Sequence, residues 1–138
     1  MDVEQTAPDW DVLREAAVAA MRTAYAPYSH YPVGVAGLVD DGRVVSGCNV
    51  ENASYGLTLC AECGMVSSLA AGGGGRLRAV LCVNGSHEVI MPCGRCRQLL
   101  SEHADADCLV MTPRGEVTMG EVLPQAFGVQ DLDRSEAP

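Results

Sequence analysis

The sequence has 138 residues, of which 48% are hydrophobic and 20% charged, and its formal net charge is −9. This length and composition are typical of a single globular domain with a core of its own. All nine basic residues are arginines without a strongly basic segment, so we expect no nucleic-acid partner and a small uncharged ligand instead. Apolar runs stay below the roughly 18 residues of a membrane span, and no secretory signal is present, so we expect a soluble, cytoplasmic protein without a membrane partner.

The first half of the chain predicts a helix followed by a hairpin. Apolar residues at helical spacing predict a helix over 9–24, with Asp9 as its N-terminal cap. Valine-rich stretches at 33–40 and 43–50 predict two strands. The dipeptide Asp41-Gly42 between them is typical of a tight hairpin.

In the second half, strands alternate with helices. A run of four glycines at 72–75 is not followed by Gly-Lys-Ser/Thr, so it predicts the end of a helix and not a phosphate-binding loop. The strand that comes next is almost continuously apolar, which indicates burial on both faces. The remaining predicted elements are a helix at 60–71, a strand at 77–83, a helix at 93–103, a strand at 108–112 and a short helix at 119–123.

This order of elements predicts the fold class. Strands that alternate with helices after an opening hairpin form a mixed sheet with helices on both faces. We therefore predict an α/β protein, a three-layer α/β/α sandwich. We expect a single domain over 1–138 with its core at about 9–128 and flexible ends.

The cysteines are the strongest chemical signal. The sequence has seven, and four of them form two Cys-x-x-Cys pairs, Cys60 with Cys63 and Cys93 with Cys96. In a reducing compartment such thiols are metal ligands or core residues more often than disulfides. The spacing alone leaves a closed four-cysteine zinc site and an open catalytic site equally supported. Glu62 favours the open site, because a zinc-activated water needs a base beside it and a structural zinc does not.

Longer motifs surround these residues in a fixed order. From about Trp10 to Gly128 the chain contains "AYAPYSHYPVGVA", "GCNVENASYG", "CAE", "PCGRCRQ" and "LPQAFG". With these motifs the chain resembles the small homotetrameric zinc-dependent cytidine deaminases of the cytidine/deoxycytidylate deaminase superfamily. The resemblance implies a central mixed five-stranded sheet, one Zn²⁺ per chain, and a homotetramer with its sites at subunit interfaces. It also implies hydrolytic deamination of cytidine and deoxycytidine to uridine and deoxyuridine plus ammonia, in pyrimidine salvage.

Matched position by position, the resemblance implies the roles of the central residues. Cys60, Cys93 and Cys96 would be the zinc ligands. Glu62 would take a proton from the activated water, deliver it to N3 of the cytosine ring and later protonate the leaving amine. Arg97 would donate to a ligand sulfur and so offset the negative charge of three thiolates.

The resemblance also implies the substrate-binding residues. Asn49 and Glu51, two apart on the predicted strand, would bind the ribose hydroxyls; the alternative is a polar hairpin edge. Tyr31 would line the base pocket where the family usually has phenylalanine, unless it is a plain core aromatic. Phe127 would close over the base in a neighbouring subunit, or else anchor a C-terminal helix in the core. Ala61 would offer its backbone N–H to the base, and Tyr55 would line a site across the interface.

The sequence departs from the family pattern at Cys63, where many relatives have an arginine. Cys63 has three interpretations: a fourth ligand that closes the site, a neutral thiol beside the zinc, or a buried core residue. Cys48, Cys82 and Cys108 lie in apolar strands and are predicted to be small core residues.

Three other functions remain as alternatives. A nucleoside-antibiotic (blasticidin-type) deaminase would use the same chemistry, but Asn49 and Glu51 favour a plain ribose. A non-catalytic four-cysteine zinc module would use the metal only to hold the fold. A thiol redox protein is the weakest alternative, since it needs one Cys-x-x-Cys pair and not two.

Overall fold

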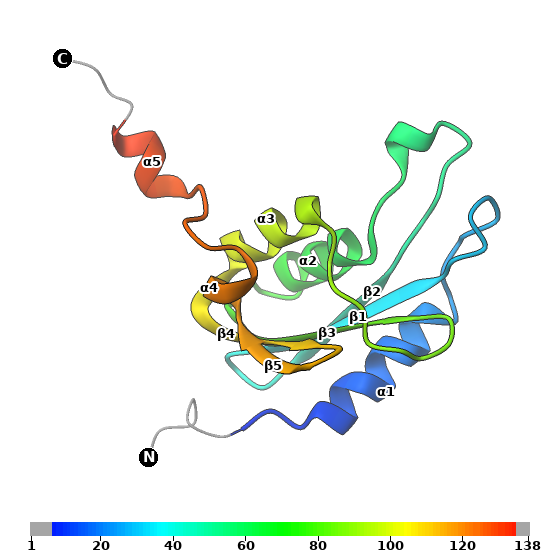
Figure 1. Ribbon diagram of the computed structural model, residues 1–138, viewed down its shortest axis with the longest axis horizontal. Coiled ribbons are helices and arrows are strands. Elements are labelled where there is room, and N and C mark those ends of the chain that lie inside the picture. The colour runs from blue at the N-terminus through cyan, green and yellow to red at the C-terminus, as the bar shows by residue number, and fades with distance from the viewer. Residues whose placement is uncertain (1–6, 135–138) are drawn as a thin grey trace.

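The computed structural model describes residues 7–134 (Figure 1). The described elements are α1 (Trp10–Met21), β1 (Val33–Val39), β2 (Val44–Cys48), the short 3-10 helix η2 (Tyr55–Leu57), α2 (Ala61–Ala71), β3 (Leu77–Asn84), α3 (Gly94–His103), β4 (Ala104–Thr112), β5 (Gly115–Thr118), α4 (Met119–Val122) and α5 (Val129–Arg134). In these residues no helix is long and apolar enough to cross a membrane.

The strands form one mixed sheet in the order β2-β1-β3-β4-β5. β1 pairs antiparallel with both β2 and β3, β3 pairs parallel with β4, and β4 pairs antiparallel with β5. The parallel pair is joined by α3, the connection that two parallel strands require. The predicted mixed five-stranded sheet is therefore confirmed.

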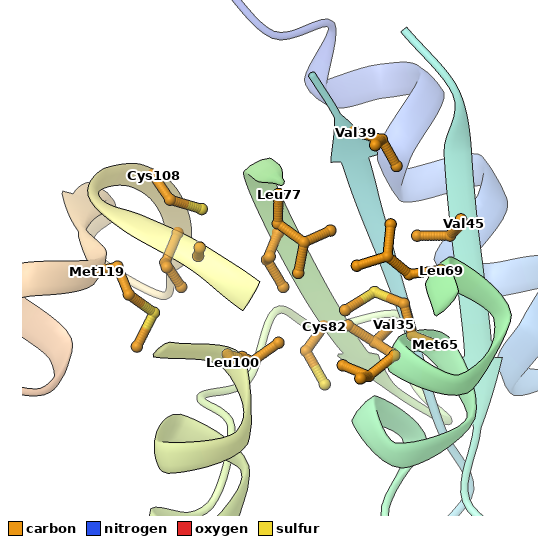
Figure 2. Close-up of a cluster of buried hydrophobic side chains, with 14 of the residues drawn as sticks. Val35, Val39, Val45, Met65, Leu69, Leu77, Cys82, Leu100, Cys108 and Met119 are labelled. Carbon is orange, nitrogen blue, oxygen red and sulfur yellow. The ribbon is translucent and has the colours of Figure 1, made fainter. Parts of the chain in front are cut away.

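Helices cover both faces of this sheet, which gives the predicted three layers. α1 packs against β1, β2 and β3 on one face, while α2, α3 and α4 lie on the other (Figure 1). The alternation of β1 divides the core accordingly, with Ala36 in the cluster under α1 and Val35 and Val39 in the cluster under α2. Figure 2 shows this second cluster, in which Met65 of α2 and Leu100 of α3 meet Cys82 of β3.

The hairpin and the glycine run have the predicted structures. The Val39 N–H donates to the Arg43 carbonyl at 2.8 Å, and Gly42 takes a φ of 95°, which glycine adopts readily. The glycine run begins at Gly72, the C-cap of α2, so it ends the helix as expected.

Several boundaries differ from the sequence prediction. The first helix ends at Met21, and the second hairpin strand ends at Cys48. β4 begins at Ala104 and not at 108, because pairing of Ala104 with Leu77 overrides the low strand propensity of the aspartates that follow. The short strand β5 and the helix α5 were not predicted. Flexible ends were expected outside about 9–128; residues 129–134 form α5, and residues 1–6 and 135–138 lie outside the described part of the chain.

Gly47 allows α2 to lie directly on the sheet. A Cβ atom at this position would lie 2.4 Å from the Ala61 carbonyl oxygen and 2.5 Å from the Met65 nitrogen. Both are backbone atoms of α2, so they cannot move aside independently of the helix. The N-terminus of α2 therefore has its position because residue 47 has no side chain.

We expect Gly47→Ala to displace α2. The overpacking should lower the free energy of unfolding by about 1–3 kcal/mol, measured by urea denaturation. Because α2 begins beside Cys60, the zinc content per chain should fall as well. Gly56→Ala is the matched control, since a Cβ there meets nothing within 4 Å. An unchanged unfolding curve for Gly47→Ala would contradict this account of the helix position.

Candidate metal centre and active site

Two cysteines stand at the N-termini of two helices. Cys60 is the N-cap of α2 and Cys93 is the N-cap of α3, each with extended backbone (φ −69°, ψ 158° and φ −66°, ψ 169°). Cys96 lies in the first turn of α3 and is fully buried. The free N–H groups and the dipole at a helix N-terminus stabilise a thiolate, so both helices favour metal binding at the same point.

The three thiols are close enough to share one ion. The Sγ atoms of Cys60, Cys93 and Cys96 lie within 4.8 Å of one another, and those of Cys60 and Cys93 are 3.8 Å apart. Sulfur ligands about 2.3 Å from a tetrahedral zinc are about 3.8 Å from each other, so the cluster fits zinc. Among the side chains that the structure describes, this is the one group of three or more potential ligands, and Cys63 is not part of it. A site with three protein ligands leaves a position for water.

The environment sets different pKa values for the three thiols. Burial raises the pKa of Cys96 and of Cys60, and the negative charge of Glu62 adds to both shifts. Burial also acts on Cys93, but the first-turn backbone N–H of Cys96 and the neighbouring thiols outweigh it, so the pKa of Cys93 is lowered. A divalent cation bound to the cluster would favour the thiolate form of all three.

Glu62 lies beside this cluster. It is the second residue of α2 and its side chain is only 3% exposed. Its charge also raises the pKa of Cys82, whose thiol is shifted first by burial. Cys82 comes from β3 and lies beneath the space between α2 and α3 (Figure 2). The carboxylate is therefore held in a largely water-excluded position next to the metal ligands.

The cysteines predicted to be core residues fall into two groups. Cys82 and Cys108 are each 2% exposed, which confirms the prediction for these two, and burial raises the pKa of Cys108 to about 12. Cys48 is only partly buried, and its sulfur accepts the Thr23 hydroxyl at 3.6 Å. Cys63 is also partly buried, so its interpretation as a buried core residue is not supported.

Asn49 and Glu51 follow the end of β2 and do not lie on the strand as predicted. The buried Asn49 amide accepts the Val33 N–H at 2.9 Å and donates to the Tyr31 carbonyl at 3.0 Å. The Glu51 carboxylate accepts the N–H groups of Tyr28 and Ser29 at 3.0 and 3.1 Å and the Ser29 hydroxyl. The Ser29 side chain and these N–H groups lower the pKa of Glu51, so it is ionised at neutral pH.

The aromatic residues predicted for substrate binding are exposed. Tyr31 is 49% exposed, Phe127 59% and Tyr55 77%. A core position for Tyr31 or Phe127 is therefore wrong. The ring of Tyr55 lies 6.3 Å from that of Tyr28, and both line a cavity of about 320 Å³ that also contains Glu51.

Arg97 binds backbone carbonyls. Its Nε donates to the Pro92 carbonyl at 2.9 Å, and its Nη1 approaches the Val122 carbonyl at 3.5 Å. The side chain thus fixes the residue before Cys93 and joins α3 to α4. The predicted bond from Arg97 to a sulfur stays a prediction.

Sequence reasoning missed Asn84, at the end of β3. It is 8% exposed, and its amide donates to the Tyr31 hydroxyl at 3.2 Å. A single asparagine before glycine is typical of a turn, so the sequence held no separate signal for this contact.

Three thiols around a metal position and a buried carboxylate, on a three-layer α/β/α fold, define a zinc-dependent hydrolase site. The family described as "Cytidine and deoxycytidylate deaminase zinc-binding region" matches residues 9–112. The chain belongs to this family, and the fit of the thiol cluster agrees with its zinc-binding region.

Individual relatives match over nearly their whole length. A cytidine deaminase of Mycobacterium tuberculosis is 57% identical over 126 residues, which cover 91% of this chain and 95% of the relative. The crystal structure of cytidine deaminase from Mycobacterium leprae superposes with a TM-score of 0.85 at 61% identity, covering 86% of this chain and all of that one. The enzyme from Burkholderia pseudomallei gives a TM-score of 0.76 at 43% identity, over 85% of this chain and 98% of that one.

The geometry predicts different effects on zinc content for replacing Cys63 and for replacing Cys96. Each is the second cysteine of a Cys-x-x-Cys pair, but only Cys96 belongs to the cluster. Cys63→Ser should keep one zinc per chain, measured by elemental analysis, because Cys63 lies outside the cluster. The matched variant Cys96→Ser removes a buried member of the cluster and should lose most of the metal. Loss of zinc from Cys63→Ser would instead favour a closed four-cysteine site.

Proposed function

We propose that the protein is a cytidine deaminase, which hydrolyses cytidine and deoxycytidine to uridine and deoxyuridine with release of ammonia. The observation on which the proposal depends is the buried Glu62 carboxylate beside three thiols that leave one metal position for water. A closed four-cysteine module has no use for that carboxylate. Membership of the deaminase family and the named activity of the relatives support the same reaction.

Cys60, Cys93 and Cys96 would hold the zinc. When bound, the metal lowers the pKa of a water molecule so that it can add to C4 of the cytosine ring at neutral pH. Glu62 accepts the proton that this water loses and delivers it to N3. The same carboxylate then takes the remaining proton of the hydroxyl added at C4 and transfers it to the exocyclic amine, so that the C–N bond breaks, ammonia leaves and C4 becomes a carbonyl. Burial of Glu62 excludes competing water from these transfers.

The ribose is the part of the substrate that Asn49 and Glu51 would bind. One N–H of the Asn49 amide donates to Tyr31, which leaves the second N–H for a ligand. The ionised Glu51 has acceptor capacity beyond its contacts with Tyr28 and Ser29. A sugar hydroxyl fits both groups. The fixed positions of these two side chains favour a nucleoside over free cytosine, because without the sugar they would lose partners.

The cytosine ring would meet Tyr31 and the backbone N–H of Ala61. Ala61 is the first residue of α2, and an N–H at this position has no partner within the helix. Tyr55 and Phe127 are mostly exposed in the single chain, so each would contribute to a site that includes a neighbouring subunit.

A homotetramer would cover the exposed apolar residues around this region. Large apolar side chains left exposed on neighbouring segments, here 25–28 and 50–59, are typical of an interface. They are Tyr25, Tyr28, Val50, Tyr55, Leu57 and Leu59. The seven free cysteines support a reducing cytoplasm, where the reaction would serve pyrimidine salvage.

Replacing Glu62 by Gln tests the reaction. The zinc-loaded chain should convert cytidine to uridine, followed by the change in ultraviolet absorbance. Glu62→Gln should keep one zinc per chain and lower kcat at least 10³-fold, on the order of the contribution of a positioned proton-transfer group.

Glu116→Gln is the matched control, because Glu116 lies exposed on β5, and its kcat should equal that of the unsubstituted chain. Near-normal turnover by Glu62→Gln would exclude the proton-transfer role. A zinc-loaded chain without turnover would favour the non-catalytic zinc module.

Introducing a charge among these exposed apolar residues tests whether the chain assembles into a tetramer. The unsubstituted chain should sediment at about four times its 14.5 kDa mass. Leu57→Asp should dissociate the tetramer and lower turnover, because a charge would be buried at the interface. Val12→Asp, also at an exposed apolar position but on α1, should remain tetrameric and active. A monomeric, fully active chain would contradict sites shared between subunits.

A further inference from the structure

Asn84 is one of three buried polar residues in the part of the chain that the structure describes. The others are Asn49 and Glu62, both assigned to the site. Asn49 is 9% exposed, Glu62 3% and Asn84 8%. Burial of an amide is unfavourable unless its hydrogen-bonding groups find partners. The contacts of Asn84 therefore identify what it stabilises.

The Asn84 amide has a complete set of partners. Its Oδ1 accepts the backbone N–H groups of Ser86 and Glu88, both at 3.0 Å. Its Nδ2 donates to the Glu88 carboxylate at 3.0 Å and to the Tyr31 hydroxyl at 3.2 Å. Since backbone N–H groups can only donate, the oxygen must face them, and the amide nitrogen must face Tyr31.

One half of this amide fixes the turn that leads to the metal ligands. The Asn84 N–H donates to the Glu88 carbonyl at 3.0 Å, and the Ile90 N–H donates to the Cys82 carbonyl at 3.0 Å. Val89 pairs with Val83, so the chain returns along β3 before it reaches Cys93. The position of Asn84 is thus tied to the segment that delivers Cys93.

The other half of the amide fixes Tyr31. Asn49 holds the backbone carbonyl of Tyr31 at 3.0 Å, and Asn84 holds its hydroxyl at 3.2 Å. The residue is therefore anchored at both ends although its side chain is half exposed. Because Asn84 donates, the hydroxyl oxygen is the acceptor, and the O–H of Tyr31 remains available as a donor.

We propose that Asn84 is a positioning residue of the substrate pocket, which fixes the Tyr31 ring relative to the segment that delivers Cys93. The inference goes one step beyond the proposed function, on which it depends for the identity of the substrate. Asn84 acts through Tyr31 and does not touch the reacting atoms.

A double-mutant cycle tests this coupling. Tyr31→Phe keeps the ring and removes the hydroxyl. In the zinc-loaded chain it should raise KM for cytidine about fivefold, the factor for one neutral hydrogen bond, and leave kcat within about twofold. In an Asn84→Ala background the same substitution should change KM less than twofold, because its partner is already absent.

Glu88→Gln is the matched control. It keeps an acceptor for the Asn84 amide and does not reach Tyr31, so KM should be unchanged. Equal effects of Tyr31→Phe in both backgrounds, or a fall in melting temperature without a change in KM, would overturn the inference.

The same variants separate the inference from the proposed function. Absence of cytidine turnover in the unsubstituted chain overturns the proposed function. The cycle is then measured on the midpoint of thermal unfolding, where non-additive shifts support the Asn84–Tyr31 link and additive shifts overturn it.

Discussion

Two helices that begin at the same point are the constraint on which the site depends. The thiols of Cys60 and Cys93 are 3.8 Å apart because α2 and α3 start side by side over the sheet. The contact of α2 with Gly47 fixes the position of the N-terminus of α2, and the return of the chain along β3 fixes that of α3. Neither helix alone supplies three ligands. The metal position is therefore a property of the packed sheet and not of a local motif.

The sequence was sufficient to predict the parts of the fold that local chemistry determines. The hairpin at Asp41-Gly42, the end of α2 at Gly72 and the helix starts beside Cys60 and Cys93 each follow from residues next to them. β5 was missed because four residues give no periodicity, and the start of β4 at Ala104 because pairing with Leu77 decides it. The start of β4 depends on a contact between residues far apart in sequence, whereas β5 pairs with its neighbour β4.

The same distinction applies to the site. The ligands and Glu62 could be predicted because their spacing along the chain is itself the signal. Asn84 could not, because its role depends on Tyr31, which is 53 residues away in sequence. The motif places Arg97 next to Cys96 in sequence, but the acceptors that its side chain meets are decided by the path of the Pro92 backbone. Motifs therefore pointed to the groups that we propose to react, and tertiary packing determines the contacts that hold them.

The charge balance of the site follows from these contacts. Three thiolates and a divalent cation would sum to −1, and the buried Glu62 carboxyl group lies nearby. The Arg97 guanidinium is occupied by two carbonyls, and Cys63 stands where an arginine could have supplied another positive charge. The backbone N–H groups at the starts of α2 and α3 also contribute positive potential, and those of α3 lower the pKa of Cys93. In this chain, stabilisation of the negative charge at the cluster therefore depends on the backbone at two helix N-termini.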